Sequence, residues 1–436
     1  MLSSVCFIFR SIFPPNLPTR VYIHCEARPR HIRQKLSVFS ECPSLLRNIS
    51  EIEIEREVLI DKQPIKPPVL DFRTTLILSA FLRNVPHMPQ LHTAAFSGIK
   101  VKQEHLALLF QSISLHHLIL FRCRLPKSVC LPPSPIRYLT LSMRSDCKLV
   151  GPLLGHCSAN LETLDFTGQL TQLLGSTTLP LFPKLRKLRF EEAPGSISRL
   201  DILISLAPQL EHLEVDGQAD FLSRLSALPA SLNRFSIGRW MINDRDFGTR
   251  PFVHLPHLHI THYHHLTQSD HRGSIIPTIQ RIFPNITSLD LDIKWDFRNL
   301  ALLLARHLPN VTRLGLGISG HGVYDLDIGA HLKYFAEPRG PLASLYVYAK
   351  CASGFDMETY KSWVIHIVLG PNPGLGGPYL QEVEMIFDNS TRSLWLSTSG
   401  KGGCLQSMER KEERMFWVYS HGQVSEGPCI GDRDSL

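Results

Sequence analysis

The stretch LHHLILFRCRL, residues 115–125, decides the fold. It follows the pattern L-x-x-L-x-L-x-x-C-x-L, in which one residue separates Leu118 from Leu120. This alternation puts both leucines on one face of a short strand and the residues beside them on the other face. Cys123 stands where a small polar side chain usually ties the turn to the backbone of the next unit. Because one unit of this length cannot bury its own apolar face, we expect further copies.

The same L-x-x-L-x-L core, with apolar substitutes, recurs along most of the chain. Its central residues in the other copies are Ile52, Ala94, Leu139, Leu164, Leu188, Leu213, Phe235, Leu258, Leu289, Leu314, Leu345 and Val383. From Leu118 to Leu258, successive centres lie 21 to 25 residues apart. After Leu258 the intervals lengthen, so the segments between strands carry insertions there. A pattern of this kind with a period of about 20–29 residues is typical of leucine-rich repeats.

Stacked repeats predict an α/β leucine-rich-repeat solenoid, or horseshoe, with roughly twelve rungs. Its strands are expected to form a parallel sheet on the concave side, with helices or turns on the convex side. The solenoid is expected to span residues 17–395, with a regular core at about 75–350 and less regularity after 350. Residues 396–436 are expected to form a C-terminal strand, at 415–419, and a disordered tail.

Local patterns predict what lies between the repeat strands. They indicate a short strand at residues 21–23 and a proline-rich loop at 58–73. A proline recurs directly before the strand cores, where it ends the preceding helix. The helices that the apolar spacing predicts span residues 31–46, 104–111, 201–206 and 299–307.

The composition is that of a folded chain without membrane spans. Hydrophobic residues make up 43% of the 436 residues, and no apolar run is long enough to cross a bilayer. The net charge of +7 is spread along the chain, and its most basic stretch, residues 20–35, favours a solvated helix face over nucleic-acid or membrane contact. The ten cysteines show no CxxC spacing, and residues 1–13 lack the features of a signal peptide. We therefore expect an intracellular protein, cytoplasmic or nuclear.

No motif in the sequence predicts catalysis. Six histidines crowd residues 254–265, where alternate positions of a strand suit zinc or copper, but the repeat register favours variable concave-face residues. GLGISG at 315–320 matches a dinucleotide-binding glycine pattern without the helix that must follow it, which favours a glycine-rich turn. Asp290, Asp292 and Asp296 lack the glycine and glutamate of a calcium loop. We expect no enzymatic activity, no metal and no cofactor.

The register also predicts which side chains face the concave side, where curved solenoids bind proteins. These positions mix aromatic, basic and acidic residues, and tyrosine and arginine are favoured at binding hot spots. Lys187 with Arg189, and Tyr346 with Tyr348, are the main candidate anchors. The full set of candidate partner-binding residues is Phe121, Tyr138, Lys187, Arg189, His212, Glu214, Arg234, His257, His259, Asp290, Arg313, Tyr346 and Tyr348.

The N-terminal segments resemble the fungal F-box proteins with leucine-rich repeats. LSSVC at residues 2–6, followed by Arg10 and Ser11, resembles the end of an F-box helix. Residues 21–23 and 39–54 resemble the strand and the helix–strand unit that follow it in that family. The resemblance implies a substrate-recognition protein of an SCF-type ubiquitin ligase, whose partners would include a Skp adaptor subunit and a cullin complex.

This resemblance leaves two functions open. Residues 1–16 would be the remnant of an F-box, because the L-P-x-E opening of the first F-box helices is not in the sequence. If that remnant docks on the Skp adaptor, the repeats recruit a protein for ubiquitination. The alternative is a leucine-rich-repeat scaffold with no ligase role after loss of the F-box, since repeats serve many unrelated functions.

Overall fold

A computed structural model shows the chain as two compact units, Met1–Leu255 and Pro256–Leu436. We call them unit 1 and unit 2 and describe each by itself. The residues that the structure describes are 19–25, 36–37, 39, 43–56, 68–126, 134–142, 150–168, 179–191, 200–216, 228–238, 251–260, 275–293, 304, 306–318, 342–349, 382–387, 392–397 and 404–409. The candidate F-box remnant, residues 1–16, and the expected strand at 415–419 lie outside them.

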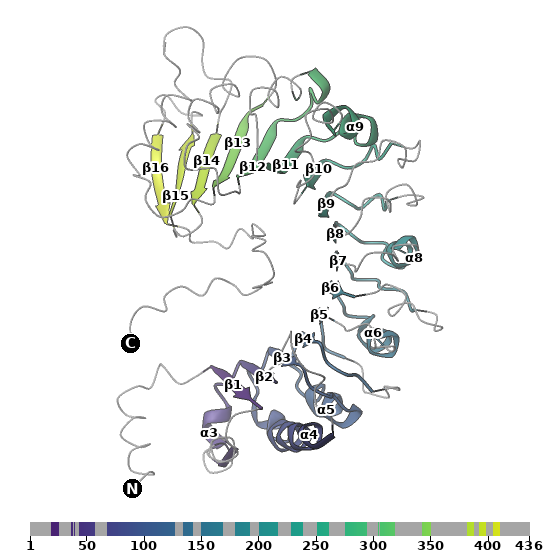
Figure 1. The fold of residues 1–436 in the computed structure, drawn as a ribbon, viewed down its shortest axis with the longest axis vertical. Helices are drawn as coiled ribbons and strands as arrows, with labels where there is room; N and C mark the ends of the chain where they lie inside the picture. The colour runs from purple at the N-terminus through teal and green to yellow at the C-terminus, as the bar shows by residue number, and fades with distance from the viewer. Residues whose placement is uncertain are drawn as a thin grey trace. The chain divides into compact units, whose positions relative to one another are not determined.

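Unit 1 is a stack of parallel strands (Figure 1). Within the described residues, each strand pairs in parallel with the next one along the chain. The strands are β1 (Arg20–His24), β2 (Glu51–Glu55), β3 (Thr93–Ser97), β4 (His117–Phe121), β5 (Tyr138–Ser142), β6 (Thr163–Thr167), β7 (Lys187–Glu191), β8 (His212–Asp216) and β9 (Arg234–Gly238). Parallel neighbours need a crossover after every strand, so this is the α/β leucine-rich-repeat solenoid that the sequence predicts.

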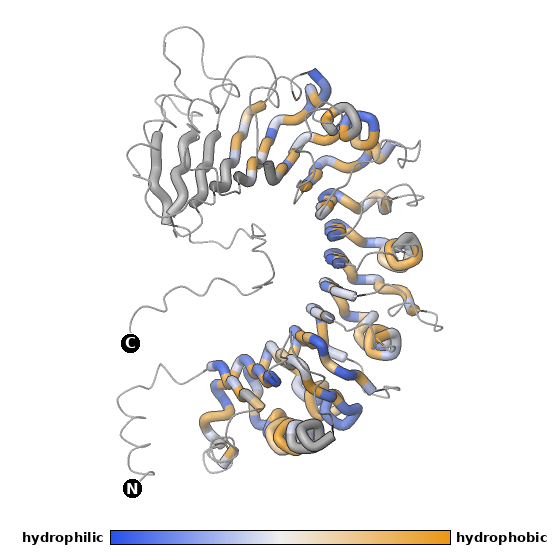
Figure 2. The backbone as a smooth tube through the Cα atoms, viewed as in Figure 1, coloured by the Kyte–Doolittle hydropathy of each residue, from blue (hydrophilic) through white to orange (hydrophobic). Residues whose placement is uncertain are grey.

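The repeat cores stand directly opposite one another in this sheet. The residues in register are Val21, Ile52, Ala94, Leu118, Leu139, Leu164, Leu188, Leu213 and Phe235. All of them are buried, and each fully buried valine, leucine, isoleucine or phenylalanine side chain contributes about 1.5–3 kcal/mol to stability. Figure 2 shows polar and apolar residues alternating along the strands. Adjacent rungs also stack, with the rings of Phe166 and Phe190 5.7 Å apart between centroids. The predicted register is confirmed.

Hydrogen bonds beyond the strands extend the ladder at both ends. Before β4, the N–H groups of His116 and His117 both donate to the carbonyl of His92, at 3.1 and 3.0 Å. After β4, Cys123 Sγ donates to the carbonyl of Phe96 at 3.2 Å. Cys123 thus ties its turn to the preceding rung and not, as its place in the repeat predicts, to the next one, because the carbonyl within its reach is that of Phe96 on β3.

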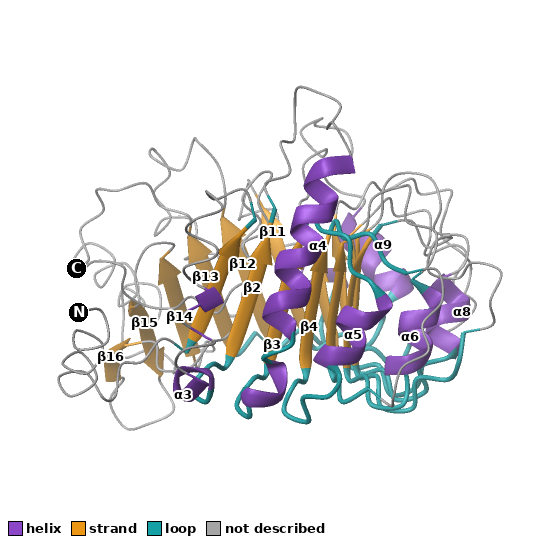
Figure 3. Ribbon diagram, turned by 90° about the horizontal axis from the view of Figure 1, so that it is seen from below, coloured by secondary structure: helices purple, strands orange, loops and turns teal. Residues whose placement is uncertain are grey.

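Helices pack on the face of unit 1 that lies away from the concave side (Figure 1, Figure 3). They are α3 (Pro43–Leu46), α4 (Pro68–Leu82), the 3-10 helix η1 (Val85–His87), α5 (Gln103–Leu109), α6 (Gly151–Cys157) and α8 (Leu200–Ser205). Helices α5 and α8 overlap the predicted spans 104–111 and 201–206. The predicted loop at 58–73 is wrong from Pro68 onward, where α4 begins. Proline is well tolerated in the first turn of a helix, because no partner awaits its missing N–H there.

Unit 2 contains parallel strands followed by two antiparallel ones. Its elements are β10 (His257–Ile260), α9 (Ile275–Ile282), β11 (Ser288–Ile293), β12 (Arg313–Ile318), β13 (Ser344–Ala349), β14 (Glu382–Phe387), β15 (Arg392–Ser397) and β16 (Cys404–Glu409). Strands β10 to β14 pair in parallel, with Leu258, Leu289, Leu314, Leu345 and Val383 in register. Of the predicted helix 299–307, the described residues 304, 306 and 307 are helical.

Strands β15 and β16, which the repeat pattern did not predict, pair antiparallel. Residues 388–391 separate β14 from β15, and residues 398–403 separate β15 from β16. These connections are shorter than the roughly twelve residues that a parallel crossover needs. Short connections therefore force the reversal of direction at this end of unit 2.

Candidate functional site

Alternate residues of each strand point to the concave face of unit 1. By their charge, these residues divide the face into three zones. The acidic zone, on β1 and β2, comprises Arg20, Tyr22, Glu51, Glu53 and Glu55. The uncharged zone, on β3 to β5, comprises Thr93, Ala95, Ser97, His117, Ile119, Phe121, Tyr138, Thr140 and Ser142. The charged zone, on β6 to β9, comprises Thr163, Asp165, Thr167, Lys187, Arg189, Glu191, His212, Glu214, Asp216, Arg234, Ser236 and Gly238.

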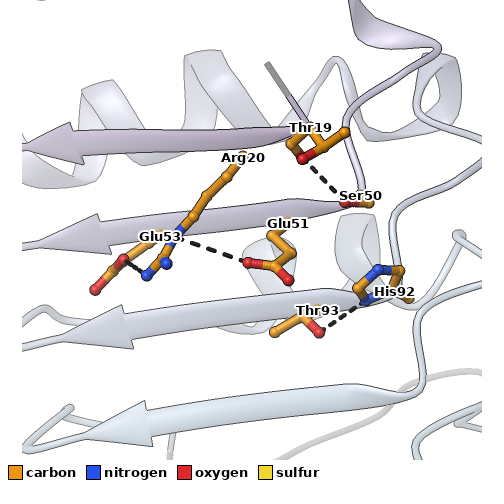
Figure 4. A network of polar contacts seen from close by, with 7 residues as sticks. All are labelled: Thr19, Arg20, Ser50, Glu51, Glu53, His92 and Thr93. Atoms are coloured by element: carbon orange, nitrogen blue, oxygen red, sulfur yellow. Dashed lines mark hydrogen bonds and ion pairs between the residues drawn. The ribbon is translucent and has the colours of Figure 1, made fainter. Parts of the chain in front are cut away.

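In the acidic zone, side chains of β1 hold the glutamates of β2. The guanidinium of Arg20 pairs with Glu53 and reaches Glu51 at 3.8 Å (Figure 4). The hydroxyl of Tyr22 donates to Glu55. The hydrogen bond to Glu53 raises the pKa of Arg20, and burial together with the hydrogen bond to Glu55 raises the pKa of Tyr22 to about 12. The three carboxylates carry more charge than Arg20 neutralises, so the zone stays acidic.

Polar contacts also fix the starts of the first strands. Ser50 Oγ donates to the carbonyl of Thr19 at 3.1 Å, which joins the residues preceding β2 and β1 (Figure 4). One rung further, His92 Nδ1 lies 2.9 Å from Thr93 Oγ1 (Figure 4). The first contact helps to set the register of β2 against β1, and the second orders the start of β3 within its own rung.

The uncharged zone presents two exposed aromatic side chains. Phe121 is 40% exposed and Tyr138 is 38% exposed, and His117 packs edge-on against Tyr138 with ring centroids 6.0 Å apart. Burial, together with His116 and His92, lowers the pKa of His117 to about 4, so this ring is neutral near pH 7. Phe121 lies opposite two small residues, Ser97 on β3 and Ser142 on β5. Large aromatic rings bury much surface on contact, and tyrosine is enriched at binding hot spots.

A row of residues directly before the strands borders the concave face and was not predicted from the sequence. His92 and His116, before β3 and β4, lie 5.5 Å apart between ring centroids, and His116 lies 5.9 Å from Tyr138. The row continues through two ion pairs, Arg137–Glu162 at 3.8 Å and Arg186–Glu211 at 3.7 Å. The repeat consensus leaves the residue directly before each strand variable, so the pattern did not single it out. Comparing that one position across the repeats would have revealed the row.

In the charged zone, a central arginine joins three strands. Arg189 Nη1 lies 3.5 Å from Asp165 Oδ2 on β6, and Arg189 Nε lies 3.3 Å from Glu214 Oε1 on β8. Arg189 is 3% exposed and Glu214 is 4% exposed, although the sequence predicted exposed positions for both. Burial raises the pKa of Asp165, and Arg189 opposes that rise. Opposite charges on neighbouring strands draw these side chains flat against the sheet, so they stabilise its face.

The rest of the charged zone is half-buried to buried. Burial lowers the pKa of Lys187, against the attraction of Glu214 and Asp165. Burial and repulsion by Asp216 raise the pKa of Glu191, which Thr167 contacts at 3.3 Å. The other concave residues of this zone that the sequence singled out as partner-binding, His212 and Arg234, are half-buried.

Unit 2 places its own candidate residues on β10 to β13. His257 and His259 are half-buried on β10, and Tyr346 is buried on β13. The guanidinium carbon of Arg313 lies 4.4 Å from the ring centroid of Tyr346, as in a cation–π pair. Tyr348 lies opposite Gly317, and its side chain is outside what the structure describes.

Asp290 and Gly315 fit together across neighbouring strands. A Cβ added at Gly315 would lie 3.0 Å from Cγ of Asp290 and closer still to Oδ1, so the carboxylate rests over the bare glycine. Gly315 and Gly317 are inside strand β12, which corrects the predicted glycine-rich turn. The strand continues through the first two glycines because its core positions, Leu314 and Leu316, are buried.

Neither a metal site nor a membrane span appears in the part of the chain that the structure describes. No three His, Cys, Asp or Glu residues lie there in a group that could hold a metal ion. Of the histidine-rich segment, His262, His264 and His265 fall outside the described residues. No helix among the described residues is long and apolar enough to cross a bilayer.

Comparisons with known proteins add little to this geometry. No protein-family profile and no curated protein matches the chain. Among solved structures, the chain is similar to the leucine-rich repeat-containing protein LegL7 from Legionella pneumophila, at 13% identity and a TM-score of 0.34, with 85% of this chain and 91% of that one covered. A TM-score at that level carries no argument, so the leucine-rich-repeat fold rests on the ladder of parallel strands.

Proposed function

We propose that the chain is a non-catalytic protein-interaction module that holds a partner protein on the concave face of unit 1. The observation that carries the proposal is the uncharged zone, where Phe121 and Tyr138 stay exposed between two zones of paired charge. Leucine-rich-repeat sheets provide extended surfaces suited to protein contact. Phe121 and Tyr138 are the anchors, Lys187 and Arg234 supply charge at one side, and His212 adds a polar ring there.

Binding at the uncharged zone gains more than binding at the charged zone. Covering Phe121 and Tyr138 removes apolar surface from water without breaking an ion pair. A partner at the charged zone would have to compete with contacts that Arg189 already makes to Asp165 and Glu214. A partner that formed new ion pairs with these buried charges would gain little binding free energy, because the cost of desolvation offsets the attraction. Arg189 and Glu214 therefore belong to the scaffold of the site.

Unit 2 has a second candidate surface. His257, His259, Asp290 and Arg313 are half-buried on its parallel strands, and Tyr346 is buried beneath Arg313. Their limited exposure makes them weaker anchors than Phe121 and Tyr138. Together with Tyr348, they form a secondary set of partner-binding candidates.

The finer proposal is that this module recognises substrates for an SCF-type ubiquitin ligase. Its support is the resemblance of residues 2–6, 21–23 and 39–54 to fungal F-box proteins with leucine-rich repeats. The Skp adaptor would then dock at residues 1–16. The alternative proposal is a repeat scaffold with no ligase role, in which the concave face binds a protein for another purpose.

Affinity purification of the tagged chain from its own cells tests the proposal. The double variant Phe121→Ala/Tyr138→Ala removes both anchors, and Ile113→Ala removes an apolar side chain that is 93% exposed in the turn before β4. Proteins captured by the wild type and by Ile113→Ala, but lost from the double variant, support binding at the uncharged zone. An identical set of proteins on all three chains contradicts it.

The same purification separates the two finer proposals. A Skp subunit and a cullin among the captured proteins, insensitive to Phe121→Ala/Tyr138→Ala, support the ligase role. Their absence, with other partners retained, favours the scaffold.

A further inference from the structure

Three basic residues lie just beyond the ends of β3 and β4, next to the uncharged zone. Lys100 and Arg124 occupy equivalent places in consecutive rungs, and a parallel backbone bridge joins them. Both are exposed, and Arg122 between β4 and Arg124 is half-exposed. We call Lys100, Arg122 and Arg124 the basic rim. Each of the three carries a positive charge, so the rim attracts anions.

The backbone at Arg122 is strained. Its φ of 52° is in the left-handed region, which the equivalent residue of the preceding rung, Gly98, occupies with a φ of 68°. The turn is the same in both rungs, because Gly98 N–H donates to the carbonyl of Phe121 and Arg122 N–H donates to that of Ser142. Glycine takes this conformation freely, whereas arginine pays for it in strain.

The strained turn places a cation beside an exposed aromatic ring. The guanidinium carbon of Arg122 lies 5.0 Å from the ring centroid of Phe121, the anchor of the proposed site. No ion pair to Lys100 or Arg122 is found among the described residues. The nearby carboxylate of Glu104 pairs with Lys102 at 3.3 Å. The rim thus presents positive charge at the edge of an apolar anchor.

We infer that the basic rim binds an acidic segment of a protein partner whose apolar residue covers Phe121. The inference rests on the proposed function, because it names the chemistry of the partner at the same site. Charge complementarity selects the occupant: carboxylates fit between Lys100 and Arg124, and Arg122 can hold a carboxylate in a bidentate pair. A long polyanion such as RNA fits less well, because across the sheet it would meet Glu51, Glu53 and Glu55.

Fluorescence anisotropy with three labelled probes tests the inference on the full chain. The probes are a short oligoglutamate peptide, the oligoglutamine peptide of the same length, and an oligothymidylate with the same number of charges. We expect oligoglutamate to bind more tightly than either of the others and to weaken as salt rises. Tighter binding of oligothymidylate would assign the rim to nucleic acid and overturn the inference.

Two variants localise the binding. Lys100→Glu/Arg124→Glu should weaken oligoglutamate binding about tenfold or more, since two attractions become repulsions. The control Arg47→Glu/Lys184→Glu changes the net charge equally, at exposed residues before β2 and β7, and should leave binding unchanged. Equal losses in both double variants would show a net-charge effect only and refute the rim.

Arg122→Gly removes the cation without straining the turn. It should weaken oligoglutamate binding while the melting temperature stays the same or rises, because glycine suits the left-handed turn. Unchanged binding in this variant contradicts the inference. If Lys100→Glu/Arg124→Glu still captures the cellular partner but Phe121→Ala/Tyr138→Ala does not, the rim is wrong and the proposed function stands. If neither loses the partner, the proposed function fails.

Discussion

Replacing Arg189 by methionine tests the buried charge network of the concave face. The change keeps most of the side-chain length and removes the cation that lies 3.5 Å from Asp165 and 3.3 Å from Glu214. At these distances each attraction is roughly 5 kcal/mol for an effective dielectric constant of about 20, before desolvation is subtracted. Removing one member of a buried pair typically costs about 3–5 kcal/mol, because the remaining charge is left without its partner. We expect about 3 kcal/mol, since Lys187 still attracts both carboxylates.

Urea unfolding followed by circular dichroism measures the loss, and amide hydrogen exchange locates it. Arg189→Met should lower the unfolding midpoint and expose the amides of β6 to β8, because repeats respond to their neighbours. The triple variant Arg189→Met/Asp165→Asn/Glu214→Gln should recover most of the stability, since neither Asp165 nor Glu214 is then left as a charge without Arg189. Acid should also relieve the single variant, by protonating the two carboxylates. An unchanged midpoint in Arg189→Met, or no recovery in the triple variant, would refute a buried network.

Three other predictions follow from buried or crowded positions. Leu118→Asp buries a carboxylate at the centre of the repeat and should unfold neighbouring rungs, whereas Ile113→Asp, in an exposed turn, should not; identical melting curves would contradict the register. Burial lowers the pKa of His105 to about 4, so its part of the stability is present above pH 6.5 and falls by up to about 3 kcal/mol as the pH drops towards 4. His105→Gln should flatten the stability profile over this range, and an equally steep profile would exclude this histidine as the cause. Gly315→Ala should cost about 1 kcal/mol, and clearly less in a chain that also carries Asp290→Ala, because the new Cβ crowds the carboxylate; equal costs in both chains would contradict the contact.

The core of the fold could be predicted because the repeat pattern specifies which residues of each strand are buried. Leu118 and Leu120 are separated by one residue and point to the same face, and copies of that pattern align in register in both units. The start of α4 was missed because Pro68 looks like a breaker but stands in the first turn of a helix. The antiparallel pairing of β15 and β16 depends on connection length, which the repeat pattern does not encode.

The candidate site was predictable in position but not in exposure. Alternation alone places Arg189 and Glu214 on the same face as Phe121. Whether a side chain on that face stays available depends on its neighbours in adjacent rungs. Opposite charges bury Arg189, whereas small residues beside Phe121 leave it exposed. The row of residues directly before the strands, which begins at His92, was not predicted because the consensus does not define that position.

Hydrogen exchange on the purified chain, free and bound to a protein captured through it, tests the concave-face proposal most directly. Binding should slow exchange in β4 and β5, residues 117–121 and 138–142, and leave α4, α5 and α6 unchanged. Protection confined to those helices, with β4 and β5 exchanging as in the free chain, would contradict the proposal that the uncharged zone is the binding surface.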